Sequence, residues 1–185
     1  RKSEASGICR KPEGNDHMNN HQQWLQSNDD YLRIAIRWVH LRLVRQIGSM
    51  VPVKAAIPEK KSWFCRNKSE PLSVTDPATK DAAIAETAKR MAAAEANNPP
   101  PALLILSQQL GLTRFERDLL LLCVAMELNS KTALLCAKAQ NNSNKSYPTF
   151  ALAAQLFDEF KWDAFSADRP LRYWRLLEIN QPGAE

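Results

Sequence analysis

A chain of 185 residues with 44% hydrophobic residues can bury the core of one ordinary domain, with or without an appendage. Its formal net charge of +5 is unevenly distributed, because residues 1–75 carry 13 Lys and Arg against 7 Asp and Glu, whereas residues 76–185 carry 12 against 13. The second part therefore lacks the basic excess that phosphate binding requires, and we do not expect nucleic acid as its partner.

The N-terminal region, residues 1–23, is polar and has almost no apolar side chain, which predicts a disordered tail. Residues 1–17 precede a candidate start at Met18 and are therefore candidates for non-native sequence. Neither a signal peptide nor a membrane-spanning stretch is recognisable, and the four cysteines form no C-x-x-C motif. We expect a cytoplasmic protein with free thiols and no membrane partner.

One helix is predicted from Asp29 to Ile47, with Ser27 or Asn28 as its N-cap. Its apolar residues form two stripes, so the helix requires partners on two sides. Either both partners lie within the chain, or one of them belongs to another subunit. The remaining polar strip contains two candidate interaction residues, Arg33 and Arg37.

A proline-rich connector follows this helix and completes the region 24–76. Its repeated prolines prevent a long helix. Two further candidate interaction residues, Trp63 and Phe64, stand beside Lys60 and Lys61. This aromatic pair either clips the connector onto the core or provides an anchor for a peptide or a nucleic-acid base.

The region 77–185 is predicted to be a helical domain organised around residues 110–135. Thr113 and Glu116 form a T-x-x-E capping box, in which each side chain accepts a hydrogen bond from the backbone N–H of the other residue. The following run, Leu119–Met126, is apolar on every side. A helix with this pattern is buried all round.

Further helices are expected on both sides of this centre: a long Ala-rich one over Thr79–Ala96, and others over Ala102–Leu110, Lys131–Ala139 and Phe150–Phe160. Trp162 and Phe165 are expected to anchor in the core. One helical turn, Pro170–Trp174, precedes a predicted short strand, Arg175–Ile179. A strand needs a partner, and because none is evident before the last residue, we expect the chain to be truncated within its domain.

Motifs that bind cofactors or perform catalysis are not recognisable. The five glycines do not have the spacing of a P-loop or of a dinucleotide-binding turn. The three histidines all precede residue 41, and neither zinc-ligand spacing nor a hydrolase triad is evident. We therefore predict no catalytic, cofactor-binding or metal-binding residue in this chain.

Six blocks of the sequence resemble a known family: Asn28–Leu32, Pro100–Leu103, Gly111–Cys123, Ala139–Gln140, Tyr147–Phe150 and Asp168–Glu178. The most specific are FERDLLLLC, residues 115–123, and DRPLRYWRLLE, residues 168–178. In this order, over residues 24–179, they resemble the N-terminal region of bacterial AAA+ ATPases associated with extracellular contractile injection systems, which are phage-tail-like particles.

This resemblance implies a mainly α fold with a winged-helix-like C-terminal portion that precedes an ATPase core. No position here matches the Walker A, Walker B or arginine-finger motifs, so ATP and Mg are implied only for a downstream domain, in a parent protein that hydrolyses ATP. The implied role of the chain is non-catalytic. It positions the ring against its own ATPase domain, neighbouring subunits of a homo-oligomer, an adaptor or a substrate, in assembly or remodelling of a contractile particle.

Within DRPLRYWRLLE, one interpretation is that Arg169, Arg172 and Arg175 are solvated or ion-paired. The other is that Arg172 and Arg175 contact the following ATPase domain. Two alternatives to this function remain open. The segments 129–139 and 147–160 could form a DNA-binding helix-turn-helix. However, the recognition candidate, Phe150–Lys161, would carry two acidic residues, Asp158 and Glu159, against the one lysine, Lys161. The chain could also be a free-standing helical scaffold protein.

Overall fold

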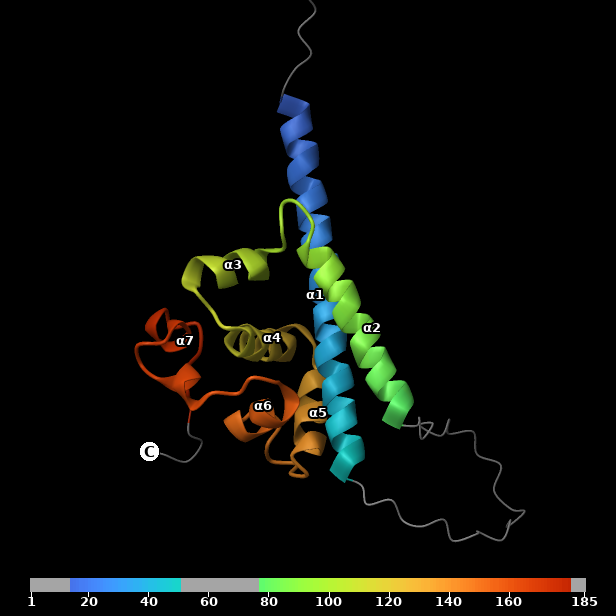
Figure 1. Cartoon of the computed structure of the whole chain (residues 1–185), viewed down its shortest axis with the longest axis vertical. Coiled ribbons are helices and arrows are strands. Elements are labelled where there is room, and N and C mark those ends of the chain that lie inside the picture. The colour runs from blue at the N-terminus through green and yellow to red at the C-terminus, as the bar shows by residue number, and fades with distance from the viewer. Residues whose placement is uncertain (1–13, 51–76, 181–185) are drawn as a thin grey trace, which may run out of the picture.

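The computed structural model describes residues 14–50 and 77–180, and these residues form helices and loops without a β-strand (Figure 1). The helices are α1 (Gly14–Met50), α2 (Pro77–Glu95), α3 (Ala102–Leu110), α4 (Arg114–Leu128), α5 (Lys131–Ala139), α6 (Phe150–Leu156) and α7 (Pro170–Tyr173), with a 3₁₀ turn, η1 (Trp162–Phe165), before α7. The prediction of a mainly α, multi-helix fold is confirmed. None of the helices in the described ranges is long and apolar enough to cross a bilayer.

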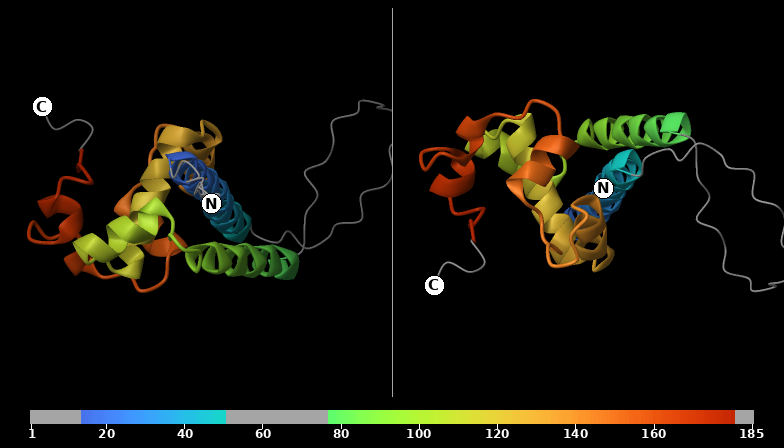
Figure 2. Two further views of the ribbon diagram at one scale, coloured as in Figure 1. Left: turned by 90° about the horizontal axis from the view of Figure 1, so that it is seen from above. Right: turned by 90° about the horizontal axis from the view of Figure 1, so that it is seen from below.

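The axis of the fold is α1. Helix α2 runs antiparallel beside it, and α4, α5 and α6 also pack against it (Figures 1 and 2). Both predicted stripes of α1 reach the core, since Trp38 of one stripe and Val39 and Leu43 of the other are buried. The two partners that this helix requires are therefore found within the chain. We expected the other helices to pack around residues 110–135, and this is wrong, because they pack mainly against α1.

Helix α1 is longer than predicted at both ends. Residues 14–23, which the sequence placed in a disordered tail, form its first turns, and the helix ends at Met50. No proline interrupts residues 14–50, so a helix nucleated by its buried middle extends through polar residues. Ser27 and Asn28 consequently lie inside the helix and do not cap it.

Both of these residues instead hold the loop between α2 and α3. The Asn28 Oδ1 atom accepts a hydrogen bond from the backbone N–H of Ala102, at 2.9 Å. The Ser27 Oγ atom accepts from the side-chain amide of Asn97, at 3.3 Å. A polar pair that looks like a local cap is thus a tertiary contact.

The predicted start of α4 is confirmed. Helix α3 ends at Gly111, which has a left-handed φ of 64°, and the chain then enters the capping box. The Thr113 hydroxyl accepts from the Glu116 backbone N–H at 3.3 Å, and the Glu116 carboxylate accepts from the Thr113 N–H at 2.7 Å. Most sides of helix α4 are buried, in line with its apolar run. Its buried apolar residues are Phe115, Leu119, Leu121, Leu122 and Ala125.

Helix α6 is shorter than predicted. It ends at Leu156, whose carbonyl accepts a hydrogen bond from the Arg42 guanidinium. The same guanidinium pairs with Asp158 at 3.1 Å. Because Arg42 satisfies this carbonyl and holds the residues after it, the chain leaves the helix four residues before Phe160.

The predicted strand at Arg175–Ile179 is wrong. The backbone turns after α7, and Arg175 has a left-handed φ of 53°. The N–H groups of Leu176 and Leu177 both donate to the Leu171 carbonyl, at 2.9 and 3.1 Å. In the segment RLLEI, Leu176 and Leu177 therefore close the turn after α7 and pack against the core, and the segment does not pair with another strand.

The two aromatic anchors predicted after α6 behave differently. Phe165 packs among the rings of Phe115, Phe150 and Phe160, which confirms its prediction. Trp162 is 76% exposed, so its prediction is wrong. Its ring meets the ring of Phe160 edge to face, with centroids 4.8 Å apart.

Candidate functional site

Large apolar side chains are exposed in the C-terminal part of the described chain. We call residues 160–179 the aromatic segment. In it, Trp162 is 76% exposed, Tyr173 66%, Trp174 55% and Ile179 40%. Tyr173 and Trp174 meet edge to face, with ring centroids 5.0 Å apart. Such a concentration of exposed aromatic surface is typical of a region that contacts another protein.

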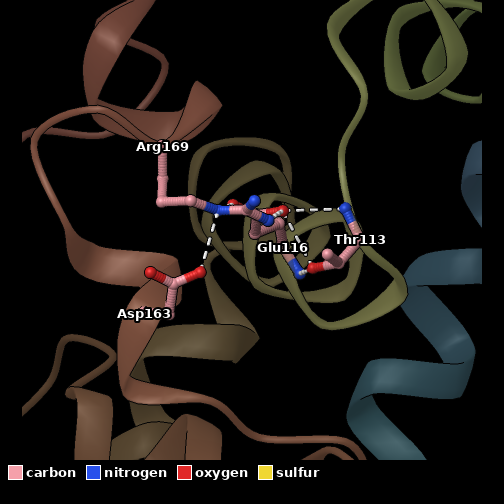
Figure 3. A network of polar contacts seen from close by, with 4 residues as sticks. All are labelled: Thr113, Glu116, Asp163 and Arg169. Carbon is pink, nitrogen blue, oxygen red and sulfur yellow. Dashed lines mark hydrogen bonds and ion pairs between the residues drawn. The ribbon is translucent and has the colours of Figure 1, made fainter.

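An ion pair fixes this segment to the middle of the fold. The Arg169 guanidinium reaches from the start of α7 to Glu116 in the first turn of α4 (Figure 3). Its Nε atom donates to Glu116 Oε1 at 3.1 Å, and its terminal nitrogen donates to Oε2 at 2.8 Å. This two-pronged geometry is the strongest form of an arginine–carboxylate pair. The hydrogen bonds to Glu116 raise the pKa of Arg169 above its usual value.

Glu116 carries the charge at the centre of this arrangement, and its side chain is fully buried. Besides the two bonds from Arg169, its carboxylate accepts from the N–H of Thr113 at 2.7 Å and from the Thr113 hydroxyl at 2.8 Å. Asp163 approaches Arg169 from the solvent side, at 3.5 Å (Figure 3). A buried carboxylate is stable only with partners of this kind, so the capping box and the aromatic segment depend on each other.

The interaction residues predicted on helices are exposed but do not form one site. Arg33 and Arg37 are exposed on α1, and Arg33 pairs with Asp30 at 3.3 Å. Arg172 and Arg175 are exposed at α7, and Arg172 donates to a backbone carbonyl, that of Phe165. Helix α7 lies apart from α1 in both views (Figures 1 and 2).

The predicted aromatic pair Trp63 and Phe64 lies outside the described residues. Its role therefore stays a prediction.

Sequence reasoning missed two polar links between distant elements. The first joins Glu116 to Arg169, although Glu116 was recognised as part of a cap. In the second, the Glu95 carboxylate accepts from the Tyr31 hydroxyl at 3.0 Å and pairs with Arg117 at 3.4 Å. One feature of the sequence pointed to the first link: Glu116 and Arg169 lie in FERDLLLLC and DRPLRYWRLLE, the two most specific blocks of the resemblance. Nothing in the sequence indicates the second.

The cysteines and the histidine of the interior lie among packed side chains. Burial raises the pKa of the Cys123 and Cys136 thiols to about 11, and both are free, as predicted. His40 is half-buried, and burial lowers its pKa. Its Nε2 lies 2.8 Å from the Thr132 hydroxyl, which itself donates to the Ala125 carbonyl.

Residues 14–50 and 77–180 bring together no cluster of three or more His, Cys, Asp or Glu that could hold a metal ion.

Comparison with known proteins gives one match. The family described as "winged helix domain, variant" matches residues 26–185. No curated protein and no solved structure matches the chain. Since the family covers most of the sequence, the chain belongs to this winged-helix family, which confirms the expectation of a winged-helix-like portion.

Proposed function

We propose that the chain is a non-catalytic winged-helix module that precedes a AAA+ ATPase core and positions the ATPase ring against its neighbours. The observation that carries the proposal is the Glu116–Arg169 pair. Its two residues belong to FERDLLLLC and DRPLRYWRLLE, the blocks on which the resemblance to the ATPases of contractile injection systems chiefly rests. The pair gives these two blocks a shared physical task, which is to hold the aromatic segment in place.

The aromatic segment supplies the contact surface in this proposal. Tyr173 and Trp174 are exposed, and Arg172 and Arg175 flank them on the same short stretch. Aromatic residues and arginine are the residue types most enriched at the centre of protein interfaces. We assign this surface to the following ATPase domain or to a neighbouring subunit of the homo-oligomer.

ATP and Mg belong to the downstream core in this proposal, and hydrolysis takes place there. The module itself contributes position, and through it the ring acts on an adaptor or a substrate in assembly or remodelling of a contractile particle. The setting that the resemblance implies is the bacterial cytoplasm.

The test compares products of the full reading frame. Replacing Tyr173 and Trp174 together by serine should reduce ring assembly, measured by light scattering, and the rate of ATP hydrolysis. The matched control is Tyr147→Ser, which removes an exposed tyrosine outside the aromatic segment. A double variant that assembles and hydrolyses ATP like the unchanged protein contradicts the assignment of this surface.

Binding of duplex DNA is the second candidate, because winged-helix folds are used as DNA-binding modules. One observation disfavours it: α6, the candidate recognition helix, has the sequence FALAAQL and carries no Lys or Arg. Duplex binding by this chain that weakens steeply with added salt would favour this second function over the first.

A further inference from the structure

A groove of about 540 Å³ lies between the second half of α2, helix α3 and the start of α4. We call it the α2–α3–α4 groove. Its α2 wall is formed by small and flexible apolar side chains, Ala88, Met91 and Ala92, and Trp38 of α1 also lines it. The volume is within the range of sites that bind small molecules or short peptide segments. The groove is separate from the aromatic segment, and no residue predicted from the sequence as an interaction residue lines it.

Two residues of this groove carry a buried polar atom that lacks a hydrogen-bond partner. They are Trp38, which is 3% exposed, and Ser107, which is 6% exposed. Neither the Trp38 Nε1 nor the Ser107 Oγ atom has a partner among the described residues. Buried polar atoms are rarely left without a partner in proteins. Because an indole N–H can only donate, a molecule that satisfies Trp38 must present an acceptor.

The charges that line the groove balance each other. Arg117 lies between two carboxylates, with Glu95 at 3.4 Å and Asp118 at 3.9 Å. Arg114 is the other cation of the lining and is exposed. Two arginines therefore face two acidic residues, and a phosphate or another anion would meet carboxylates as well as guanidinium groups. This balance favours an occupant without net charge.

We infer that the α2–α3–α4 groove binds an uncharged, apolar peptide segment of a partner protein. Main-chain carbonyls of the segment accept hydrogen bonds from the Trp38 indole N–H and the Ser107 hydroxyl. Its small apolar side chains lie against the alanines of α2, where short side chains allow another backbone to approach closely. A peptide suits this site because every residue provides one main-chain acceptor beside an apolar side chain. The inference holds whether or not an ATPase core follows the chain.

The test uses N-acetyl-leucine N-methylamide, an uncharged molecule with two carbonyl acceptors and one apolar side chain, and NMR of the full chain. Increasing concentrations should shift the Trp38 indole N–H signal to saturation. The signal is identified by its loss in Trp38→Phe or, where that variant does not fold, by resonance assignment. Ser107→Ala should weaken binding roughly three- to tenfold, which corresponds to one hydrogen bond. Folding is not at risk in this variant, because the hydroxyl has no partner among the described residues.

A matched pair of substitutions tests the position of the site. Ala92 and Ala93 are neighbouring exposed residues of α2, but only Ala92 lines the groove. Ala92→Leu should block the probe, whereas Ala93→Leu should leave its affinity unchanged. The inference is overturned if the probe causes no saturable shift, if both leucine variants have the same affinity as the unchanged chain, or if inorganic phosphate competes with the probe.

Discussion

Replacing Arg169 by alanine should destabilise the fold by about 3 kcal/mol. The substitution removes two of the four hydrogen bonds that the fully buried Glu116 carboxylate accepts, and it leaves that charge without a counter-ion. Breaking a buried ion pair in this way costs roughly 3–5 kcal/mol. The side chain of Arg169 is 27% exposed, so water can partly replace it, and we expect the lower end of that range. Against a typical total stability of about 5–15 kcal/mol, this is a large loss.

Urea unfolding, followed by tryptophan fluorescence, measures this loss. Arg172→Ala is the matched control, because Arg172 is an exposed arginine three residues further along the chain that bonds only to a backbone carbonyl. It should change the free energy of unfolding by less than about 1 kcal/mol. Glu116→Gln combined with Arg169→Ala should cost less than the sum of the two single changes, since they share one interaction. An Arg169→Ala protein as stable as the Arg172→Ala protein would refute the reasoning.

Three further predictions concern stability. Burial raises the pKa of the Asp118 carboxyl from 3.8 to about 6, so this group binds a proton more readily in the folded state than in the unfolded state. The contribution of Asp118 to the free energy of unfolding therefore falls as pH rises from about 4 to 6. Asp118→Asn should remove this fall and stabilise the protein at pH 7 by about 2–3 kcal/mol in urea unfolding; equal slopes between pH 4 and 6 for both proteins would contradict this. Gly111→Ala should lower the free energy of unfolding by about 1 kcal/mol in the same assay, because an alanine at φ 64° is strained. Steric clash adds nothing, since no atom lies within 4 Å of an added Cβ. An unchanged stability would show that the backbone relaxes. Trp174→Ser should leave the unfolding free energy within about 0.5 kcal/mol, since the side chain is 55% exposed, and a larger loss would mean that Trp174 belongs to the core.

The parts of the fold that the sequence predicts are those in which cause and effect lie close together in the chain. Thr113 and Glu116 are three residues apart, Gly111 precedes them, and an apolar run follows, so the start of α4 could be read directly. The polar first turns of α1 follow no such local rule. They are helical because they continue a helix whose middle is buried, and the apparent cap residues Ser27 and Asn28 are used for a contact with residues about 70 positions away.

The candidate sites could be predicted only in part, for the same reason. The arginines of DRPLRYWRLLE stood out in the sequence, but which of them is buried against a carboxylate depends on how α7 packs on α4. Arg169 makes that contact and Arg172 does not. The α2–α3–α4 groove is built from four helices, and the missing partners of Trp38 and Ser107 become evident only when those helices are assembled.

The central claim, that this chain positions a AAA+ ATPase core, is tested most directly by sequencing the reading frame beyond the codon for Glu185. The account predicts an open frame that encodes a G-x-x-x-x-G-K-[ST] P-loop within about one domain length, roughly 100–150 residues. An immediate stop codon, or a long frame without a P-loop, would contradict the claim. The chain would then be a winged-helix protein that acts without an attached ATPase.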